Sequence, residues 1–236
     1  MSDDITNNSR VFLYSMIFLV HNSFSDNSCV LMYTNSTTSL LLLTLVFNLD
    51  IYQTKMSCCP PESLGRLGAL NYQPKGKVIQ ESDLDIYVVG SGAKCVIWNY
   101  DIHGFNSGRT KQLADLLAES GFLVVMPDYF RGTWQDPTKP GVLEFLKRTT
   151  QWSNIKADWE LKIRPVAIAH GAKEFGSFGT CWGSYPVVRF SSLSEFKVGV
   201  SAHPSHTRIS SALGEQEKEI LENVRYKIMR MKTSEV

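Results

Sequence analysis

Short apolar runs alternate with amphipathic stretches along the chain from about residue 84 onward. Two of these runs, 94–100 and 122–126, are continuous, which is typical of strands buried on both faces of a sheet. Shorter strands are predicted at three further places, 85–89, 175–179 and 197–201. Because Gly or Pro punctuates several of these runs, we expect strands in preference to buried helical segments.

Helices are predicted between the strands. Leu113, Leu116 and Leu117 recur at helical spacing within 110–120, and Gly121 follows as the expected C-terminal cap. The other helices are expected at 142–150, within 155–169, at 185–193 and at 215–224. Strands that alternate with helices predict an α/β fold, with a mostly parallel sheet and helices on both of its faces.

The first 55 residues differ from the rest, since they contain no Gly, Pro, Ala, Glu or Trp. Their apolar runs, 11–20 and 40–47, are shorter than the ~20 residues that span a bilayer, so no stable membrane span is expected. An acidic start and the lack of a small-residue cleavage site disfavour a secretory signal, which stays open as an alternative. We therefore expect 1–55 to be an extension, disordered or an artefact of the reading frame, ahead of a natural start at Met56.

The composition fits one domain, at 56–225, followed by a divergent tail at 226–236. The chain has 236 residues, 43% of them hydrophobic, which is enough for the core of an α/β domain. Its net charge of +1 gives no electrostatic reason to expect nucleic acid as a partner. The five cysteines are odd in number and lack zinc-site spacing, so we expect a cytoplasmic protein with no metal site. They are Cys29, Cys58, Cys59, Cys95 and Cys181.

The sequence Gly179-Thr180-Cys181-Trp182-Gly183 carries the clearest chemical signal. It matches a nucleophile elbow, a sharp strand-to-helix turn with the pattern G-x-S-x-G, with cysteine in place of serine. Glycines are needed because the turn is tight and the helix packs close to the strand. A small buried cysteine between two turn glycines is the alternative interpretation.

Four segments in this order resemble the dienelactone hydrolase family, the carboxymethylenebutenolidase-like branch of the α/β-hydrolases. They are Asn-Tyr-Asp-Ile-His-Gly at 99–104, Val-Val-Met-Pro-Asp-Tyr-Phe-Arg-Gly at 124–132, Gly-Ser-Phe-Gly-Thr-Cys-Trp-Gly at 176–183 and Gly-Val-Ser-Ala-His-Pro-Ser at 199–205. The resemblance covers about residues 65–225. It implies metal-free hydrolysis of a small-molecule ester or lactone through an acyl-enzyme, without a cofactor.

The resemblance also implies roles for individual residues. Cys181 matches the nucleophile, and the backbone N–H groups of Trp182 and Ile102 match the two oxyanion donors. Asp101 lies where the family often has a glutamate that touches the resting cysteine, although a turn-capping role is the alternative. Arg131 lies near the position of a basic residue for a substrate carboxylate, and the alternative is a solvated loop arginine.

The chain departs from the family after the elbow. The α/β-hydrolase triad runs in the order nucleophile, acid, histidine. No aspartate follows Asp158, and the last histidines are His203 and His206, at the end of the strand after the elbow helix. His203 is expected to line the substrate site instead of serving as the base, and His103 and His170 are weak candidates for the base.

These departures predict a chain truncated at its C-terminus, lacking the last strands of the sheet and leaving one edge uncovered. The polar pattern after 226 does not predict a buried strand. Three functions therefore remain open: an ester or lactone hydrolase, a catalytically inactive family member that acts as a binding protein, and a thiol redox protein that uses Cys181 with the Cys58–Cys59 pair. The oligomeric state is not predicted.

Overall fold

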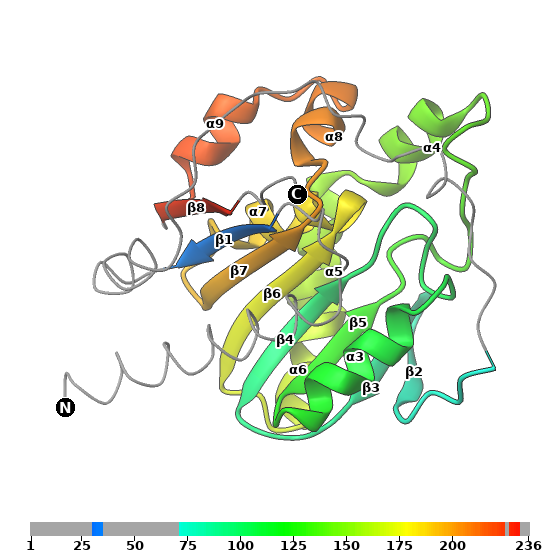
Figure 1. Ribbon diagram of the computed structural model, residues 1–236, viewed down its shortest axis with the longest axis vertical. Coiled ribbons are helices and arrows are strands. Elements are labelled where there is room, and N and C mark those ends of the chain that lie inside the picture. Colours follow the sequence, from blue (N-terminus) through cyan, green and yellow to red (C-terminus); the bar gives the residue numbers. More distant parts are fainter. Residues whose placement is uncertain (1–29, 35–70, 225–226, 232–236) are drawn as a thin grey trace, which may run out of the picture.

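The computed structural model describes residues 30–34, 71–224 and 227–231. The strands in these ranges form one eight-stranded sheet in the order β2-β3-β5-β4-β6-β7-β1-β8 (Figure 1). The strands are β1 (Val30–Thr34), β2 (Lys77–Glu81), β3 (Leu84–Val89), β4 (Lys94–Asn99), β5 (Leu123–Pro127), β6 (Glu174–Thr180), β7 (Phe196–Ala202) and β8 (Lys227–Met231).

The helices lie between the strands, as the hydrophobic pattern predicts. They are α3 (Thr110–Glu119), α4 (Val142–Thr149), α5 (Trp152–Asp158), the π-turn η2 (Trp159–Ile163), α6 (Arg164–Ala169), the 3₁₀ turn η3 (Cys181–Gly183), α7 (Ser184–Phe190), α8 (His206–Ala212) and α9 (Glu217–Glu222). Helix α3 covers one face of the sheet, and α5 and α6 lie on the opposite face (Figure 1). The α/β architecture with helices on both faces is thereby confirmed.

The four central strands are parallel, whereas the flanks are antiparallel. Strand β4 pairs in parallel with β5 and β6, and β6 pairs in parallel with β7. Strands β2 and β3 add an antiparallel pair beyond β5, and β1 runs antiparallel to both β7 and β8. The sheet is therefore mixed, and the prediction of a mostly parallel sheet holds for its centre. The carboxyl ends of the four parallel strands meet at one edge, where open α/β sheets place their ligand sites.

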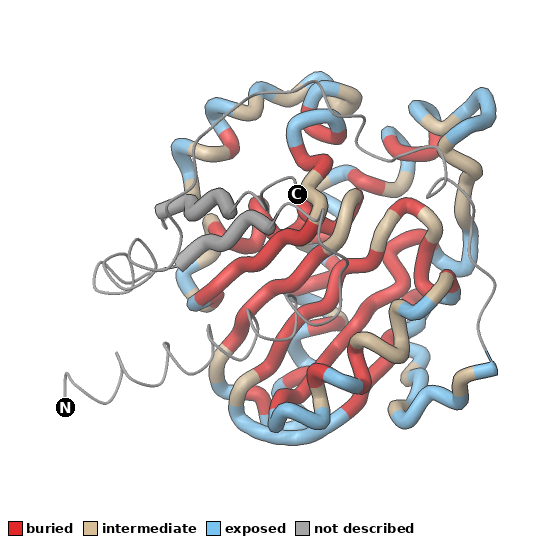
Figure 2. The backbone as a smooth tube through the Cα atoms, in the orientation of Figure 1, coloured by how far each residue is buried: buried red, intermediate tan, exposed pale blue. Residues whose placement is uncertain are grey.

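The central strands are buried along most of their length (Figure 2). All five residues of β5 are buried, and so are five of the six residues of β4, as their continuous apolar sequences predict. Aromatic rings fill the space between the sheet and the helices, with Trp159 packed edge-on against Phe175 and Phe190 at centroid distances of 5.0 and 5.6 Å. This core fixes the sheet on which the functional residues stand.

A π-turn interrupts the helix that runs from Trp152 to Ala169. The sequence predicts a helix within 155–169, and the structure begins it three residues earlier. The N–H of Arg164 donates to the carbonyl oxygen of Trp159, five residues earlier. Pro165 follows directly, and a proline has no N–H and clashes with the carbonyl four residues before it. The wider turn accommodates this proline without ending the helix.

Several elements are absent from the sequence-based prediction. Strand β2 and helix α8 carry mixed polar sequences without a clear apolar period. Residues 30–34 form β1, a strand within the extension that the sequence analysis separates at 1–55. Residues 227–231 form β8, and β1 and β8 continue the sheet beyond β7, where an uncovered edge was expected.

Other predictions fall outside the described residues. The apolar runs at 11–20 and 40–47, the start at Met56 and the Cys58–Cys59 pair all belong to this group. Of the helices that the structure does describe, none has both the length and the apolar character needed to cross a bilayer.

Candidate active site

Cys181 occupies a strained turn at the carboxyl end of β6. Its φ is +49°, a left-handed value that residues other than glycine rarely adopt, and it lies between β6 and the 3₁₀ turn that leads into α7. The predicted strand–turn–helix context of an elbow is therefore present. Left-handed backbone at a non-glycine residue costs about 1–3 kcal/mol and concentrates at functional sites. The geometry accordingly favours the nucleophile elbow over a core cysteine at this position.

The two glycines of the elbow permit close backbone contact. A Cβ atom on Gly179 would lie 2.2 Å from the backbone oxygen of Gly183, and one on Gly183 would meet the backbone of Asn99 and Tyr100. Side chains at either position would push the turn away from β4. The glycine requirement inferred from the sequence thus has a specific steric cause.

Three candidate residues stand at equivalent positions on neighbouring strand ends. Asn99 of β4 is in register with Gly179 of β6, which is in register with Ser201 of β7. Two residues beyond these positions come Asp101, Cys181 and His203. The register therefore brings the residues that follow β4, β6 and β7 to one edge of the sheet, with Cys181 in the middle. His203 also has a left-handed backbone, with φ of +52°.

Trp182 is fixed in the core directly after Cys181. Its side chain is fully buried, and its Nε1 donates to Oγ1 of Thr150 at 2.9 Å. Its ring stacks on Tyr100 and meets Phe130 edge-on, at centroid distances of 5.6 and 4.6 Å. The backbone N–H of Trp182 belongs to the first turn of the helical segment, where N–H groups have no partner within the helix. This N–H is therefore held in place and suited to bind an oxyanion.

Asp101 and Ile102 form the start of a tight turn after β4. Oδ1 of Asp101 accepts from the N–H of His103 at 2.8 Å, and its backbone oxygen accepts from the N–H of Gly104 at 3.1 Å. The backbone N–H of buried Ile102 lies within this turn, between Asp101 and the donor His103. The side chain of Asp101 thus has the turn-capping role that was the alternative to contact with the cysteine.

Burial and charge act in opposite directions on the Asp101 carboxyl. Desolvation raises the pKa of Asp101 above its usual value. The nearby charge of His103, the two turn N–H groups and the charge of His203 lower that pKa in part. Asp101 and His203 therefore interact electrostatically across the edge of the sheet on which Cys181 stands.

Ser205 lies beside Cys181, a contact that sequence reasoning missed. Its Oγ is 3.4 Å from Sγ of Cys181. The backbone N–H of Ser205 donates to the backbone oxygen of Cys181 at 3.3 Å and to Oγ of Ser184 at 2.9 Å. Since the residues are 24 positions apart, only the fold brings them together. The position of Ser205 just past the end of a parallel strand is the one sequence signal that could have indicated it.

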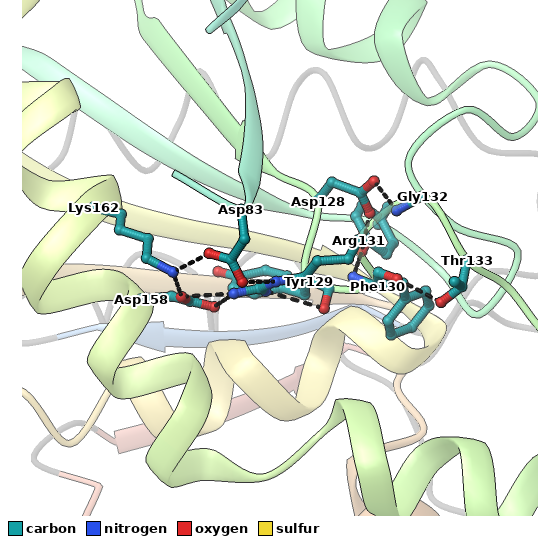
Figure 3. Close-up of polar contacts among 10 residues, drawn as sticks. Asp83, Asp128, Tyr129, Phe130, Arg131, Gly132, Thr133, Asp158 and Lys162 are labelled. Carbon is teal, nitrogen blue, oxygen red and sulfur yellow. Dashed lines mark hydrogen bonds and ion pairs between the residues drawn. The ribbon is translucent and has the colours of Figure 1, made fainter. Parts of the chain in front are cut away.

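Arg131 belongs to a network of ion pairs and has a left-handed φ of +51°. Its Nη2 lies 2.8 Å from Asp158 and its Nε lies 3.2 Å from Asp83, while Lys162 contacts both of these carboxylates (Figure 3). This network joins the β2–β3 turn to the loop after β5 and to the helix beyond. The structure therefore shows Arg131 in ion pairs. The sequence suggested either a basic residue for a substrate carboxylate or a solvated loop arginine.

The other histidines have separate partners. His206 is buried and its Nε2 lies 3.1 Å from Oε1 of Glu217, and Nδ1 of His170 lies 2.8 Å from the backbone oxygen of Val166. The ring of His103 lies 6.4 Å from that of Trp134. Within the part of the chain that the structure describes, no three His, Cys, Asp or Glu side chains gather as metal ligands would.

Comparison with known proteins gives a family and several relatives. The sequence profile described as "Dienelactone hydrolase family" matches residues 85–228, which is more than half of the chain. An uncharacterized AIM2 family protein of Schizosaccharomyces pombe is 31% identical over 162 residues, covering 63% of this chain and 65% of that protein. The carboxymethylenebutenolidase homolog of Homo sapiens is 29% identical over 143 residues, covering 57% of each chain. The match thus spans less than two thirds of either relative.

A search of solved structures finds a cold-adapted esterase from an Arctic intertidal metagenomic library. The identity is 14%, the TM-score is 0.40, and the match covers 52% of this chain and 62% of that one.

Proposed function

The chain belongs to the dienelactone hydrolase family, and from that premise we propose that it hydrolyses a small ester or lactone by attack of Cys181. The observation that carries the proposal is the left-handed backbone of Cys181 at the end of β6, between glycines whose missing side chains let the turn close. Such a turn lifts the nucleophile above the carboxyl edge of the sheet, where a substrate can reach it. A thiolate is the reactive form of cysteine in this role.

The proposed reaction has two stages. Sγ of Cys181 attacks the carbonyl carbon, the carbon–oxygen bond to the alcohol portion breaks, and that oxygen takes up a proton. Water then attacks the resulting thioester, which releases the carboxylic acid and restores the cysteine. In both stages the negative oxygen of the tetrahedral intermediate is stabilised by the N–H groups of Ile102 and Trp182. A donor of this kind is commonly worth about 3 kcal/mol of transition-state stabilisation.

The remaining candidate residues line the proposed site. His203 and Asp101 flank Cys181 at the equivalent positions of β7 and β4, and they would contact the substrate from either side. Arg131 follows β5, which ends at the same edge of the sheet as β4, and it would contribute a positive charge for a substrate carboxylate. These residues would determine which ester or lactone binds, because the two oxyanion donors contact only the carbonyl oxygen of the substrate.

The second candidate function is binding without turnover. It is favoured by the contacts of His206 with Glu217 and of His170 with the backbone oxygen of Val166, because these contacts engage two of the histidines that could act as a general base. A family member of this kind would hold an ester or acid at the same edge without cleaving it.

Hydrolysis of a small activated aryl ester tests the proposal. The full chain should turn the ester over, and Cys181→Ala should abolish turnover while the fold is retained. Cys95→Ala is the matched control, since Cys95 is buried in β4 and its pKa is raised by burial. If the unmodified chain and Cys181→Ala both hydrolyse the ester only at the uncatalysed background rate, the binding function is supported instead. Ligand-dependent thermal stabilisation of both proteins would then measure that binding.

A further inference from the structure

Ser205 does not make the capping hydrogen bond that a serine usually makes at the start of a helix. It is the N-cap residue of α8, where a serine side chain commonly accepts a hydrogen bond from an N–H of the first turn. Here the side chain makes no capping hydrogen bond, and its Oγ lies 3.4 Å from Sγ of Cys181. The hydroxyl therefore contacts Cys181, and the Ser205 side chain does not cap the N-terminus of α8.

The contact is fixed by the backbone around it. The N–H of Ser205 donates to the backbone oxygen of Cys181 and to Oγ of Ser184, and Oγ of Ser184 donates to the same backbone oxygen at 2.7 Å. These hydrogen bonds tie the loop after β7 to the elbow. Because both backbones are held in place and both side chains are short, the distance between Oγ of Ser205 and Sγ of Cys181 is fixed.

The direction of the hydrogen bond depends on the protonation of Cys181. A hydroxyl can donate or accept, whereas a thiolate can only accept, so ionisation of Cys181 makes Ser205 the donor. A donor that bonds to the charged form of a group favours that form. Ser205 is only 6% exposed, so water competes little for its hydroxyl.

Building on the proposed function, we propose that the hydroxyl of Ser205 donates a hydrogen bond to the thiolate of Cys181 and so stabilises the ionised nucleophile. The thiol proton passes to solvent base, and Ser205 keeps its own proton throughout. Ser205 is thereby a catalytic residue that touches the reacting sulfur.

Other titratable groups follow the strand ends at the same edge of the sheet or belong to the helix after β7. Asp101 and His103 follow β4, His203 follows β7, and His206 pairs with Glu217. A carboxylate opposes ionisation of a nearby thiol, and a protonated imidazole favours it. Since the variants compared below keep all of these groups, a difference between them reports the hydroxyl of Ser205.

The test is the pH dependence of Cys181 alkylation in the full chain. Iodoacetamide is the probe, and mass spectrometry of the Cys181 peptide separates this cysteine from the other four. Ser205→Ala should raise the midpoint of the profile by about one pH unit and slow alkylation several-fold below it, because a hydrogen bond to a charged group is lost. The rate at high pH, where Cys181 is ionised in both proteins, should be no lower in the variant, since a thiolate of higher pKa is the stronger nucleophile. Ser205→Thr, which keeps the hydroxyl, should retain the original midpoint.

Controls separate this effect from a general loss of structure. Ser205→Gly removes the hydroxyl while glycine remains a tolerated N-cap residue, so it should reproduce the shift even if the alanine variant folds poorly. Ser210→Ala removes another buried hydroxyl of α8 and should leave the midpoint in place. An unchanged midpoint in the folded alanine and glycine variants would overturn the proposal.

Alkylation also distinguishes this inference from the proposed function. A shifted midpoint in a protein that cleaves no ester would support the role of Ser205 and contradict the hydrolase activity. Ester turnover with an unshifted midpoint would support the hydrolase activity and contradict the role of Ser205.

Discussion

Gly183 packs against the backbone carbonyl group of Asn99 so closely that a Cβ atom on Gly183 would lie 2.2 Å from that oxygen. The first helical turn after the nucleophile therefore rests on the end of β4, the strand that leads to Ile102. Both proposed oxyanion donors depend on this single contact, because one N–H follows Cys181 and the other follows β4.

Gly183→Ala should consequently destabilise the fold by about 3 kcal/mol or more, since the obstruction is backbone that cannot rotate away. Urea unfolding of the full chain measures the loss. Gly214→Ala is the control: its φ of +74° disfavours alanine, but no atom lies within 4 Å of the added Cβ. That variant should lose only the ~1–2 kcal/mol of left-handed strain. Equal losses in the two variants would contradict the steric argument.

Trp182→Phe should cost about 1–3 kcal/mol, because it leaves Oγ1 of buried Thr150 without its indole donor. Trp182→Ala should cost about 3–5 kcal/mol through loss of ring packing. A double-mutant cycle of Trp182→Phe with Thr150→Val isolates the hydrogen bond. Strict additivity of the two changes would mean that the bond contributes nothing to stability.

His203→Gly should leave the fold as stable as before or stabilise it by up to about 1 kcal/mol, because glycine adopts a φ of +52° without strain. Ester hydrolysis should fall, since the imidazole beside Cys181 is removed. Ser82→Gly is the matched control, at φ of +58° in the β2–β3 turn. It should give a similar stability change with full activity, and a parallel fall in activity would contradict the proposed role of His203.

The ion pairs around Arg131 should make stability depend on acid pH. Lys162 and Arg131 lower the pKa of Asp83 from its usual 3.8 to about 2. A depressed folded-state pKa contributes stability that is present above about pH 4 and lost as the pH falls towards 2. Because Asp83 is 63% exposed, the contribution should be only a fraction of a kcal/mol.

Urea unfolding between pH 7 and pH 2 measures this contribution. Asp83→Asn should be slightly less stable than the unmodified chain at pH 7, and the difference should close as the pH approaches 2. A gap that stays constant across this pH range would contradict the ion-pair explanation.

The sequence predicted the elements whose signals are local. Buried strands such as β4 and β5 are continuous apolar runs, and the elbow carries its glycines within five residues. Strand β2 escaped prediction because its residues are mostly exposed, so no apolar run marks it. Helix α8 escaped because Ile209 is its sole buried apolar residue.

The sequence singled out Cys181 as a candidate nucleophile, whereas the contacts around Cys181 were less predictable. Cys181 and Trp182 follow from one pentapeptide. The partners of Arg131 come from segments 27 and 48 residues away, and the contact of Ser205 with Cys181 joins two strand ends across an intervening helix. Pairings of this kind depend on packing, which no local pattern encodes.

The π-turn at Trp159–Ile163 has a consequence for which insertions and deletions this protein can accept. A π-turn is an α-helix with one residue added, so deleting one residue there would restore regular geometry. A deletion in the regular turns of the helix would instead rotate everything after it by about 100° around the helix axis. Val166 and Ala167, both buried, would then turn away from the core. The helix can therefore lose one residue within the π-turn, but none in the regular turns before Val166.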